Sequence, residues 1–593
     1  MPRPSRGLAM ANFTRRGALM TGGAMIALAG CGEAAKPAGP DANAAFDAVA
    51  KTWLDEMAKS SPTYATQLGD HRFDAELPDV SETGRKARAA QVKATQDKLA
   101  GIDRTALSRD NQVDAAMLAE SLEAETFRAE KVQDWAWDSS GYQSSAGGSL
   151  YGLVARDFGP LPERLLNAAA RMEKFPALLA ETRKQLVAER VPPVYAQTYS
   201  AQNAGTASTI DGMILNNLSA LGPEDAARLT KAADTAKAAL AEHQTWIDTQ
   251  LVPNAKGDFR YGPLYDEQLR FSISATTPRA ELLAKARADA DAIRDEMFEI
   301  CAKLVNAKPN VDKLATIKAG MAIAAKDQPP RERLIAEATR TTEEAIAFIR
   351  EKDFIGLPDA PVRIIEMPKF QQGFSVAYCD SPGPLDRNLE TFYAISPIPS
   401  DWTEVQTRSF LSEYNSHMLY ELSIHEAMPG HYLQIWRSNK HTSTTRAVLG
   451  SGTFIEGWAC YAEDLMIEMG FGADNPLRRL TNLKMRLRSV TNAILDQGIH
   501  VENWDEAAAM KFMTGEAFQE EREAAGKWTR ARLSSGQLST YFVGWGEHHA
   551  LRKHAETTWG GEFALKKYHD TALSHGSPPA RFVRALMFDE PIA

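Results

Sequence analysis

The sequence predicts a mostly α-helical protein with one small β-sheet. Long segments carry apolar residues at three- and four-residue spacings, with Pro or Ser near their starts, as amphipathic helices do. Signals for strands are few and gather in one short region. The 593 residues, 44% hydrophobic and 24% charged, are enough to bury a large core, and this composition is neither disordered nor membrane-filling.

The N-terminus has the features of an export signal. Arg15 and Arg16 precede a short apolar run that ends in "LAGC", whose last residue is Cys31. Paired arginines resemble the signal read by the twin-arginine translocase, and "LAGC" resembles a bacterial lipobox, which implies lipidation of Cys31 and removal of residues 1–30. The alternative is an uncleaved anchor. Gly32 stands where an inner-membrane retention signal usually has Asp, which favours the periplasmic face of the outer membrane.

Three regions follow the export signal. Residues 31–45 are small, polar and contain Pro and Gly, which is typical of a flexible tether. Residues 46–274 are expected to form a helical N-terminal region, and residues 275–593 a catalytic region. The strongest helical patterns lie at 44–60, 161–189, 223–251 and 278–305.

The strand signals come just before an unusual motif. "PVRIIEMP", "FSVAYCD" and "TFYAISP" are short, rich in β-branched or aromatic residues, and bounded by Pro, Gly and Asp. They lie within residues 361–397, upstream of "HEAMPGH" at 425–431. The small sheet is therefore expected near the helix that carries this motif.

Composition excludes several classes of function. The net charge is −10 and no run of five basic residues occurs, so a nucleic-acid partner is not expected. Beyond Cys31, the odd set Cys301, Cys379 and Cys460 gives no disulfide framework and no zinc-finger spacing. The glycine patterns of nucleotide enzymes and the serine-hydrolase motif are missing from the sequence. A metal would have to be held by His and carboxylate.

"HEAMPGH" resembles the zinc-peptidase pattern H-E-x-x-H, but its second histidine comes two residues late. Positions six apart on an ideal helix lie about 240° apart, so His425 and His431 could not share an ion on an unbroken helix. Pro429 and Gly430 interrupt the helix, and the extra residues can bulge out and return His431 to the face of His425. Glu426 then lies beside the metal, where it can take a proton from a zinc-bound water.

A third ligand is expected from the segment "GTFIEGWACYAEDLMIEMG". Glu456 follows His431 by twenty-five residues on a second predicted helix, and a catalytic zinc site needs three protein ligands with the fourth position left for water. Cys460 and Glu463 share its face at helical spacing, so Glu463 is expected to orient a ligand from behind.

These blocks resemble a known family. "HEAMPGHYLQ", "FIEGWACYAEDL", "DQGIHVENW" and "GQLSTYFVGWGEHHALR", in this order over about residues 425–552, are similar to the proteins catalogued as domain of unknown function 885. That family is grouped with the helical gluzincin-like metallopeptidases. The resemblance implies a large helical fold that encloses a deep cleft, with Zn²⁺ held by His425, His431 and Glu456 and with Glu426 as general base.

The resemblance also implies further residues of the site. Related peptidases use Tyr or His to stabilise the oxyanion, so Tyr541 is the first candidate and His500 the second. The alternative for Tyr541 is a buried aromatic whose hydroxyl bonds to backbone. Arg552 is a candidate for binding a substrate carboxylate. Phe542 and Asn492 stand where relatives usually have basic residues. Both differences remove a positive charge that could recognise a substrate carboxylate.

The resulting expectation is a lipid-anchored zinc peptidase that hydrolyses short peptides in the cell envelope. Two alternatives stay open: a non-catalytic envelope scaffold with a structural metal, and a zinc hydrolase of other amides or esters. The intact Glu426 favours catalysis, because a structural site has no use for a base. The mode of cleavage and the oligomeric state do not follow from the sequence.

Overall fold

The computed structural model describes residues 41–367, 376–386 and 389–592. The export signal and Cys31 lie outside these residues, as does most of the predicted tether. The end of the tether is corrected, because α1 (Ala42–Ser60) already includes residues 42–45. The first turn is fixed in place: the Asn43 side chain accepts a hydrogen bond from the backbone N–H of Ser108, and Phe46 is fully buried.

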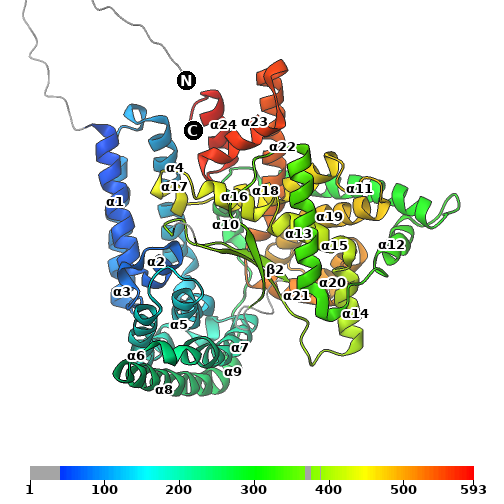
Figure 1. The fold of residues 1–593 in the computed structure, drawn as a ribbon. Helices are drawn as coiled ribbons and strands as arrows, with labels where there is room; N and C mark the ends of the chain where they lie inside the picture. The colour runs from blue at the N-terminus through cyan, green and yellow to red at the C-terminus, as the bar shows by residue number, and fades with distance from the viewer. Residues whose placement is uncertain (1–40, 368–375, 387–388, 593) are drawn as a thin grey trace, which may run out of the picture. The chain divides into compact units, whose positions relative to one another are not determined.

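The N-terminal region is helical, as predicted. Ser81 and Ser108 cap helices with their side chains, and Pro stands in the first turn of several others. The helices after α1 are α2 (Pro62–Leu68), α3 (Glu82–Ala100), α4 (Arg109–Phe127), α5 (Ser139–Val154), α6 (Leu161–Gln185), α7 (Pro193–Thr209), α8 (Pro223–Trp246) and α9 (Val252–Asn254) (Figure 1).

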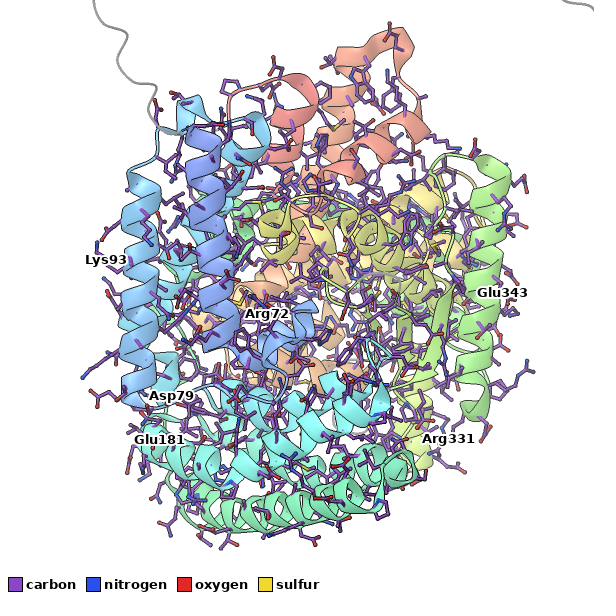
Figure 2. The ribbon with its side chains drawn as sticks, turned by 60° about the vertical axis from the view of Figure 1, so that its left-hand side comes forward. Arg72, Asp79, Lys93, Glu181, Arg331 and Glu343 are labelled. Atoms are coloured by element: carbon purple, nitrogen blue, oxygen red, sulfur yellow. The ribbon has the colours of Figure 1, made fainter. Side chains whose placement is uncertain are left out.

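Helices also dominate the rest of the chain. Charged side chains such as Lys93 of α3 and Glu343 of α13 are exposed (Figure 2), as expected for amphipathic helices. The helices before the sheet are α10 (Tyr265–Ile273), α11 (Arg279–Leu304), α12 (Lys313–Ala324) and α13 (Leu334–Lys352). Those after it are α14 (Glu404–Glu413), α15 (Ser416–Glu426), α16 (His431–Ser438), α17 (Thr444–Val448), α18 (Gly452–Glu468), α19 (Pro476–His500), α20 (Glu506–Gly515), α21 (Glu521–Arg532), α22 (Thr540–Trp559), α23 (Leu565–Ala572) and α24 (Ala580–Phe588).

The predicted small sheet is confirmed. It consists of β1 (Val362–Glu366), β2 (Ala377–Asp380) and β3 (Thr391–Ile395), in the order β1-β3-β2. β3 pairs in parallel with β1 and antiparallel with β2. All five residues of β3 are buried, which agrees with its central position. β2 contacts α15, so the sheet lies beside the helix that carries His425.

Residues Ala42–Ala593 form one compact unit. One hydrophobic cluster joins Tyr265 and Leu269 of α10 to Leu483 and Val490 of α19, and therefore extends across the predicted division near residue 275. Another cluster is built from α13, α15, α18 and the sheet, and it surrounds the motif. Within the described ranges, none of the helices combines the length and apolar character that crossing a bilayer requires.

Candidate metal centre

The motif "HEAMPGH" forms a complete break between two helices. α15 ends at Glu426 and α16 begins at His431, so the interruption is wider than the bulge expected from the sequence. The backbone N–H of Gly430 donates to the carbonyl of Ile424 at 2.9 Å, which folds the connection back onto the end of α15. The rings of His425 and His431 consequently lie with their centroids 4.7 Å apart.

Two neighbours of the break explain its residues. A Cβ at position 430 would lie 2.0 Å from the carbonyl oxygen of His425, so only glycine fits there. The indole N–H of Trp458 donates to the carbonyl of Pro429 at 2.8 Å and ties the turn to α18, the helix of Glu456. The "EGW" block thus brings the third candidate ligand and holds the turn between the first two.

Three candidate ligand atoms converge at this point. Nε2 of His425 is 3.7 Å and Nε2 of His431 is 3.3 Å from Oε2 of Glu456. All three atoms lie within 4.8 Å of one another. Tetrahedral zinc with bonds of about 2.0–2.1 Å separates its ligand atoms by roughly 3.4 Å, so the spacing fits one ion.

The chemistry of the donor set also fits a metal. Oε2 of Glu456 is buried and faces the two imidazoles, but it accepts no hydrogen bond of regular geometry from the described residues. A buried carboxylate oxygen without a partner is costly unless a cation meets it. Two imidazoles and one carboxylate, with space for a further ligand, match a catalytic zinc site rather than a closed structural one.

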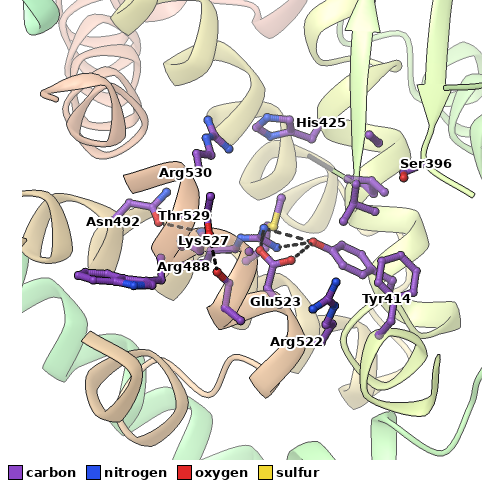
Figure 3. A pocket seen from close by; sticks show the side chains of 18 of the residues that line it. Ser396, Tyr414, His425, Arg488, Asn492, Arg522, Glu523, Lys527, Thr529 and Arg530 are labelled. Carbon is purple, nitrogen blue, oxygen red and sulfur yellow. Dashed lines mark hydrogen bonds and ion pairs between the residues drawn. The ribbon is translucent and has the colours of Figure 1, made fainter. Parts of the chain in front are cut away.

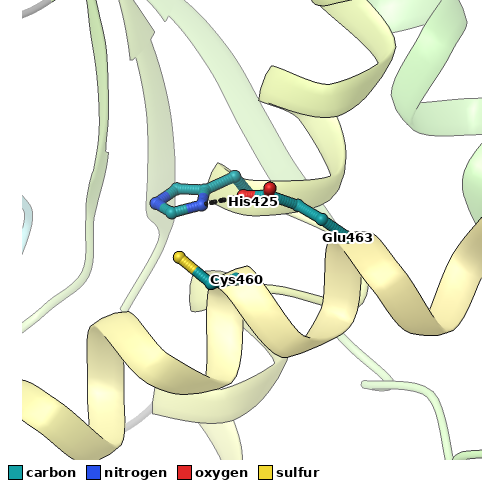
Figure 4. Close-up of side chains that lie close together, drawn as sticks. All are labelled: His425, Cys460 and Glu463. Carbon is teal, nitrogen blue, oxygen red and sulfur yellow. Dashed lines mark hydrogen bonds and ion pairs between the residues drawn. The ribbon is translucent and has the colours of Figure 1, made fainter. Parts of the chain in front are cut away.

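Glu463 supports His425 from behind, as predicted. Its Oε1 lies 2.6 Å from Nδ1 of His425, and its side chain is almost fully buried (Figure 4). This contact fixes the ring and leaves Nε2 facing Glu456. Cys460 also lies close to His425 and Glu463. Its Sγ is 3.5 Å from Oγ of Ser489, and burial raises the pKa of the thiol, which keeps it protonated.

The charges of the cluster shift the pKa values of its members. Burial acts to lower the pKa of His425, but Glu456 and Glu463 outweigh it and raise that pKa well above its ordinary value. Burial raises the pKa of Glu456, but His425 and His431 outweigh it in turn and lower that pKa. The carboxylates therefore concentrate negative charge where a cation would bind.

His425 and Glu426 open onto a cavity of about 630 Å³. Its other lining residues come mainly from β2, the segment between β3 and α14, α14, α19, α21 and the start of α22. Figure 3 shows the part that includes Ser396, Asn492, Lys527 and Arg530. This volume lies within the range of roughly 300–1,000 Å³ that is usual for ligand pockets. Glu426 thus lines a space that can hold a small molecule, together with the candidate ligand His425.

Tyr541 lies at the site, as predicted. It lines the cavity, and its ring centroid is 6.4 Å from that of His425. Its hydroxyl accepts a hydrogen bond of 2.8 Å from the guanidinium of Arg530. Burial raises the pKa of Tyr541 to about 12 although Arg530 acts against it, so the hydroxyl keeps its proton at neutral pH. A protonated phenol beside the metal ligands can donate to an oxyanion.

His500 requires a correction, because it does not line this cavity. Its Nε2 lies 2.7 Å from the carbonyl of Ser534 and 3.1 Å from that of Ala531, and the residue is buried. In the same block, Asp496 accepts a hydrogen bond from the backbone N–H of Gly536 at 2.9 Å. The "DQGIH" block therefore holds the connection that leads from α21 into Tyr541.

Arg552 requires a correction as well. Its guanidinium makes the predicted bidentate contact, but with Glu468 of the chain itself, at 2.6 and 2.7 Å, and also bonds to Glu556. It is not among the residues that line the cavity. Phe542 is likewise turned away, because it packs in the core with Lys285 above its ring.

The basic residues of α21 were missed from the sequence. Lys527 and Arg530 line the cavity, and Lys527 bonds to Asn492, the position where relatives usually have Arg. A signal existed in "AAGKWTRA": Ala524, Lys527, Trp528 and Ala531 follow the spacing of a buried helix face, and a lysine stands on it.

The fold and site define a mostly helical protein with a candidate metal centre beside a cavity. The family model described as "Bacterial protein of unknown function (DUF885)" matches residues 62–587, and the chain belongs to this family. A search among curated proteins finds no match.

Two solved structures are similar over most of their length. The first, from Shewanella oneidensis, is described as a presumed lipoprotein of unknown function; it is 31% identical, with a TM-score of 0.77, covering 91% of this chain and 99% of that one. The second, a presumed lipoprotein from Colwellia psychrerythraea, is 17% identical, with a TM-score of 0.73 and coverage of 91% and 98%. The second likeness concerns the fold alone.

Proposed function

We propose that this protein is a zinc-dependent peptidase that hydrolyses short peptides in the cell envelope. The observation that carries the proposal is the convergence of His425, His431 and Glu456 beside a cavity that Glu426 lines. The same arrangement supports a relationship to the gluzincin-like metallopeptidases.

Each residue of the site has its own role in the proposed reaction. His425, His431 and Glu456 would hold the zinc ion, which would supply Lewis acidity toward water and a carbonyl group when bound. Glu426 accepts the proton of the attacking water and passes it to the leaving amine. Tyr541 donates its hydroxyl proton in a hydrogen bond to the oxyanion, and Arg530 holds that hydroxyl in place. Glu463 keeps His425 in the ligating orientation.

The envelope location rests on two supports. The two similar structures are described as presumed lipoproteins. The sequence has twin arginines and the "LAGC" motif at Cys31. Together they favour a lipid anchor on the periplasmic side, where short peptides are available as substrates.

The test compares the mature protein with the Glu426→Gln variant. We expect about one zinc per chain in both by elemental analysis, and cleavage of a mixed-peptide library by the wild type alone. Zinc in both proteins without cleavage by either would favour the scaffold or a non-peptide hydrolase. Protein without zinc after reconstitution would remove the proposal.

A further inference from the structure

Four basic side chains that line the cavity make no ion pair with a carboxylate among the described residues: Arg522, Lys527, Arg530 and Arg532. Arg522 is exposed and Arg532 lies over the ring of Trp528, so the argument concerns Lys527 and Arg530. Lys527 and Arg530 lie one helical turn apart on α21 and both line the cavity (Figure 3). Among the described residues, no carboxylate oxygen lies within the 4.0 Å of an ion pair from either one. Arg530 bonds instead to the neutral groups Tyr541 and Gln537. This part of the cavity wall is therefore open to an anion.

Lys527 is the more unusual of the two. It is only 4% exposed, and its ammonium donates a hydrogen bond of 2.9 Å to Oδ1 of Asn492, a neutral amide. Burial lowers the pKa of Lys527, and the positive charge of Arg488 lowers it further. Burying a lysine without a carboxylate partner costs free energy. An anionic ligand that binds to Lys527 would offset this cost.

Three carboxylates line the same cavity; one is Glu426, the proposed base, and the other two offer no matching site for a cation. Glu523 is already engaged by Arg488 and by the hydroxyl of Tyr414. Glu506 is exposed, where water screens its charge. The cavity thus has buried positive charges without ion pairs, whereas Glu523 is paired and Glu506 is exposed. This difference favours recognition of a peptide's carboxyl end over its amino end.

We infer that the free C-terminal carboxylate of a peptide binds between Lys527 and Arg530, which makes the protein a carboxyl-terminal exopeptidase. The inference rests on the proposed peptidase function. Arg530 contacts Tyr541, which lies beside His425, so the anchor starts next to the candidate metal centre. Lys527 lies three residues earlier on the same helix, about 4.5 Å along its axis, so both cations can meet one carboxylate.

The test uses N-acetylated hexapeptides in two forms, with a free C-terminal acid and with a C-terminal amide. We expect the zinc-loaded protein to release a C-terminal amino acid or dipeptide from the acid, with kcat/KM for the amide lower by at least about 100-fold. Lys527→Met should raise KM for the acid and reduce the discrimination to less than about tenfold. The matched control is Lys511→Met, an exposed lysine on α20 outside the cavity.

Lys527→Met loses the hydrogen bond to Asn492 but also removes a buried charge that has no carboxylate partner, so the two effects on stability oppose each other and the fold should be retained. Binding provides a second readout that needs no turnover. In the Glu426→Gln background, calorimetry should show tighter binding of the acid than of the amide, and Lys527→Met should abolish the difference.

The outcomes separate the two proposals. Equal cleavage of acid and amide, or products from internal bonds, would overturn the exopeptidase inference and leave the peptidase proposal standing. Failure of the zinc-loaded protein to cut either form would count against the peptidase proposal, and equal binding of the two forms by the Glu426→Gln variant would overturn the anchor.

Discussion

The imidazole of His425 is constrained on both of its nitrogens. Nδ1 is held by Glu463, and Nε2 faces Glu456 and lies near His431. Each side chain therefore has a separate role, in which Glu463 sets the orientation, the three ligands meet the cation, and Glu426 faces the cavity. Because the contacts are short and buried, single substitutions should separate metal binding from turnover.

Glu463→Gln should weaken zinc binding without removing a ligand. A neutral amide makes a weaker contact with Nδ1, and loss of such a partner typically costs about 10–100-fold in metal affinity. Competition with a chromophoric chelator measures the effect. Glu468→Gln is the control, since Glu468 lies on the same helix but is half exposed and pairs with Arg552. Equal affinity of Glu463→Gln and wild type would contradict the role of Glu463.

Tyr541→Phe should reduce kcat and leave zinc content and KM nearly unchanged. The hydroxyl is expected to act only when the oxyanion forms, and loss of one such donor costs roughly 10²–10³ in kcat. Steady-state kinetics on a cleaved peptide measures this change. Tyr461→Phe removes a buried hydroxyl on α18 that bonds to His569 and does not line the cavity, so its kcat should stay at the wild-type value. A similar decrease in both variants would indicate a general effect on folding.

At the scale of elements, glycines decide how closely the helices of the site approach. α18 and α22 cross where Gly457 and Gly544 face each other; a Cβ on Gly457 would lie 2.2 Å from the backbone of Gly544. This crossing brings Glu456 and Tyr541, from separate helices, to one site. The glycines of the "EGW" and "FVGW" blocks are therefore needed for the close packing of α18 against α22, in addition to the chemistry of their neighbours.

Gly430→Ala should damage both stability and metal binding. The new Cβ would lie 2.0 Å from the carbonyl oxygen of His425 and 2.3 Å from that of Ile424, so the turn between α15 and α16 must move. We expect a loss of about 1–3 kcal/mol in the free energy of unfolding. Zinc affinity should fall by about tenfold or more, since His431 follows directly. Thermal unfolding with and without zinc measures both effects.

Gly546→Ala is the matched control for this experiment. It lies in α22, where an added Cβ meets nothing within 4 Å. Alanine in a helix interior is favoured over glycine by about 0.5–1 kcal/mol, so this variant should be slightly more stable with unchanged zinc binding. A stable, zinc-binding Gly430→Ala variant would show that the turn has another conformation open to it.

At the scale of the whole molecule, the N-terminal helices are linked to the region of the sheet. His71, just after α2, bonds to Asp74 and to Asp386, which follows β2. Burial acts to lower the pKa of His71, but Asp386 and Asp74 raise it to about 9. Arg156 adds a second link, an ion pair from the end of α5 to Asp380 of β2. The site therefore depends on contacts with distant parts of the sequence.

The free energy of unfolding should decrease at alkaline pH because of His71. Its folded pKa is raised above the unfolded value of 6.5, so its contribution is complete below about pH 6.5 and is lost as pH rises through about 9. At about 1.4 kcal/mol per pKa unit, the loss is at most about 3.5 kcal/mol. Urea unfolding at pH 6, 7.5 and 9 with saturating zinc measures it. His71→Gln should flatten the alkaline decrease, and an unchanged profile in this variant would contradict the assignment.

The sequence by itself predicted the helical class and the small sheet before the motif. It also predicted that His425, His431, Glu456 and Glu463 come together at one site. These inferences depend on periodicity and on spacing along one or two helices, which are local properties. The family followed from short blocks for the same reason, and the match over residues 62–587 confirms it.

Only the tertiary structure decided which distant side chains share a space with these ligands. His500 and Arg552 have chemistry suited to a site, yet local contacts with Ser534 and Glu468 occupy them. Lys527 and Arg530 lie in a helix rich in charged residues, and the packing of this helix against α14, α19 and α20 places them at the cavity. The direction in which a helix face points depends on what packs against it, and that information is spread over the whole chain.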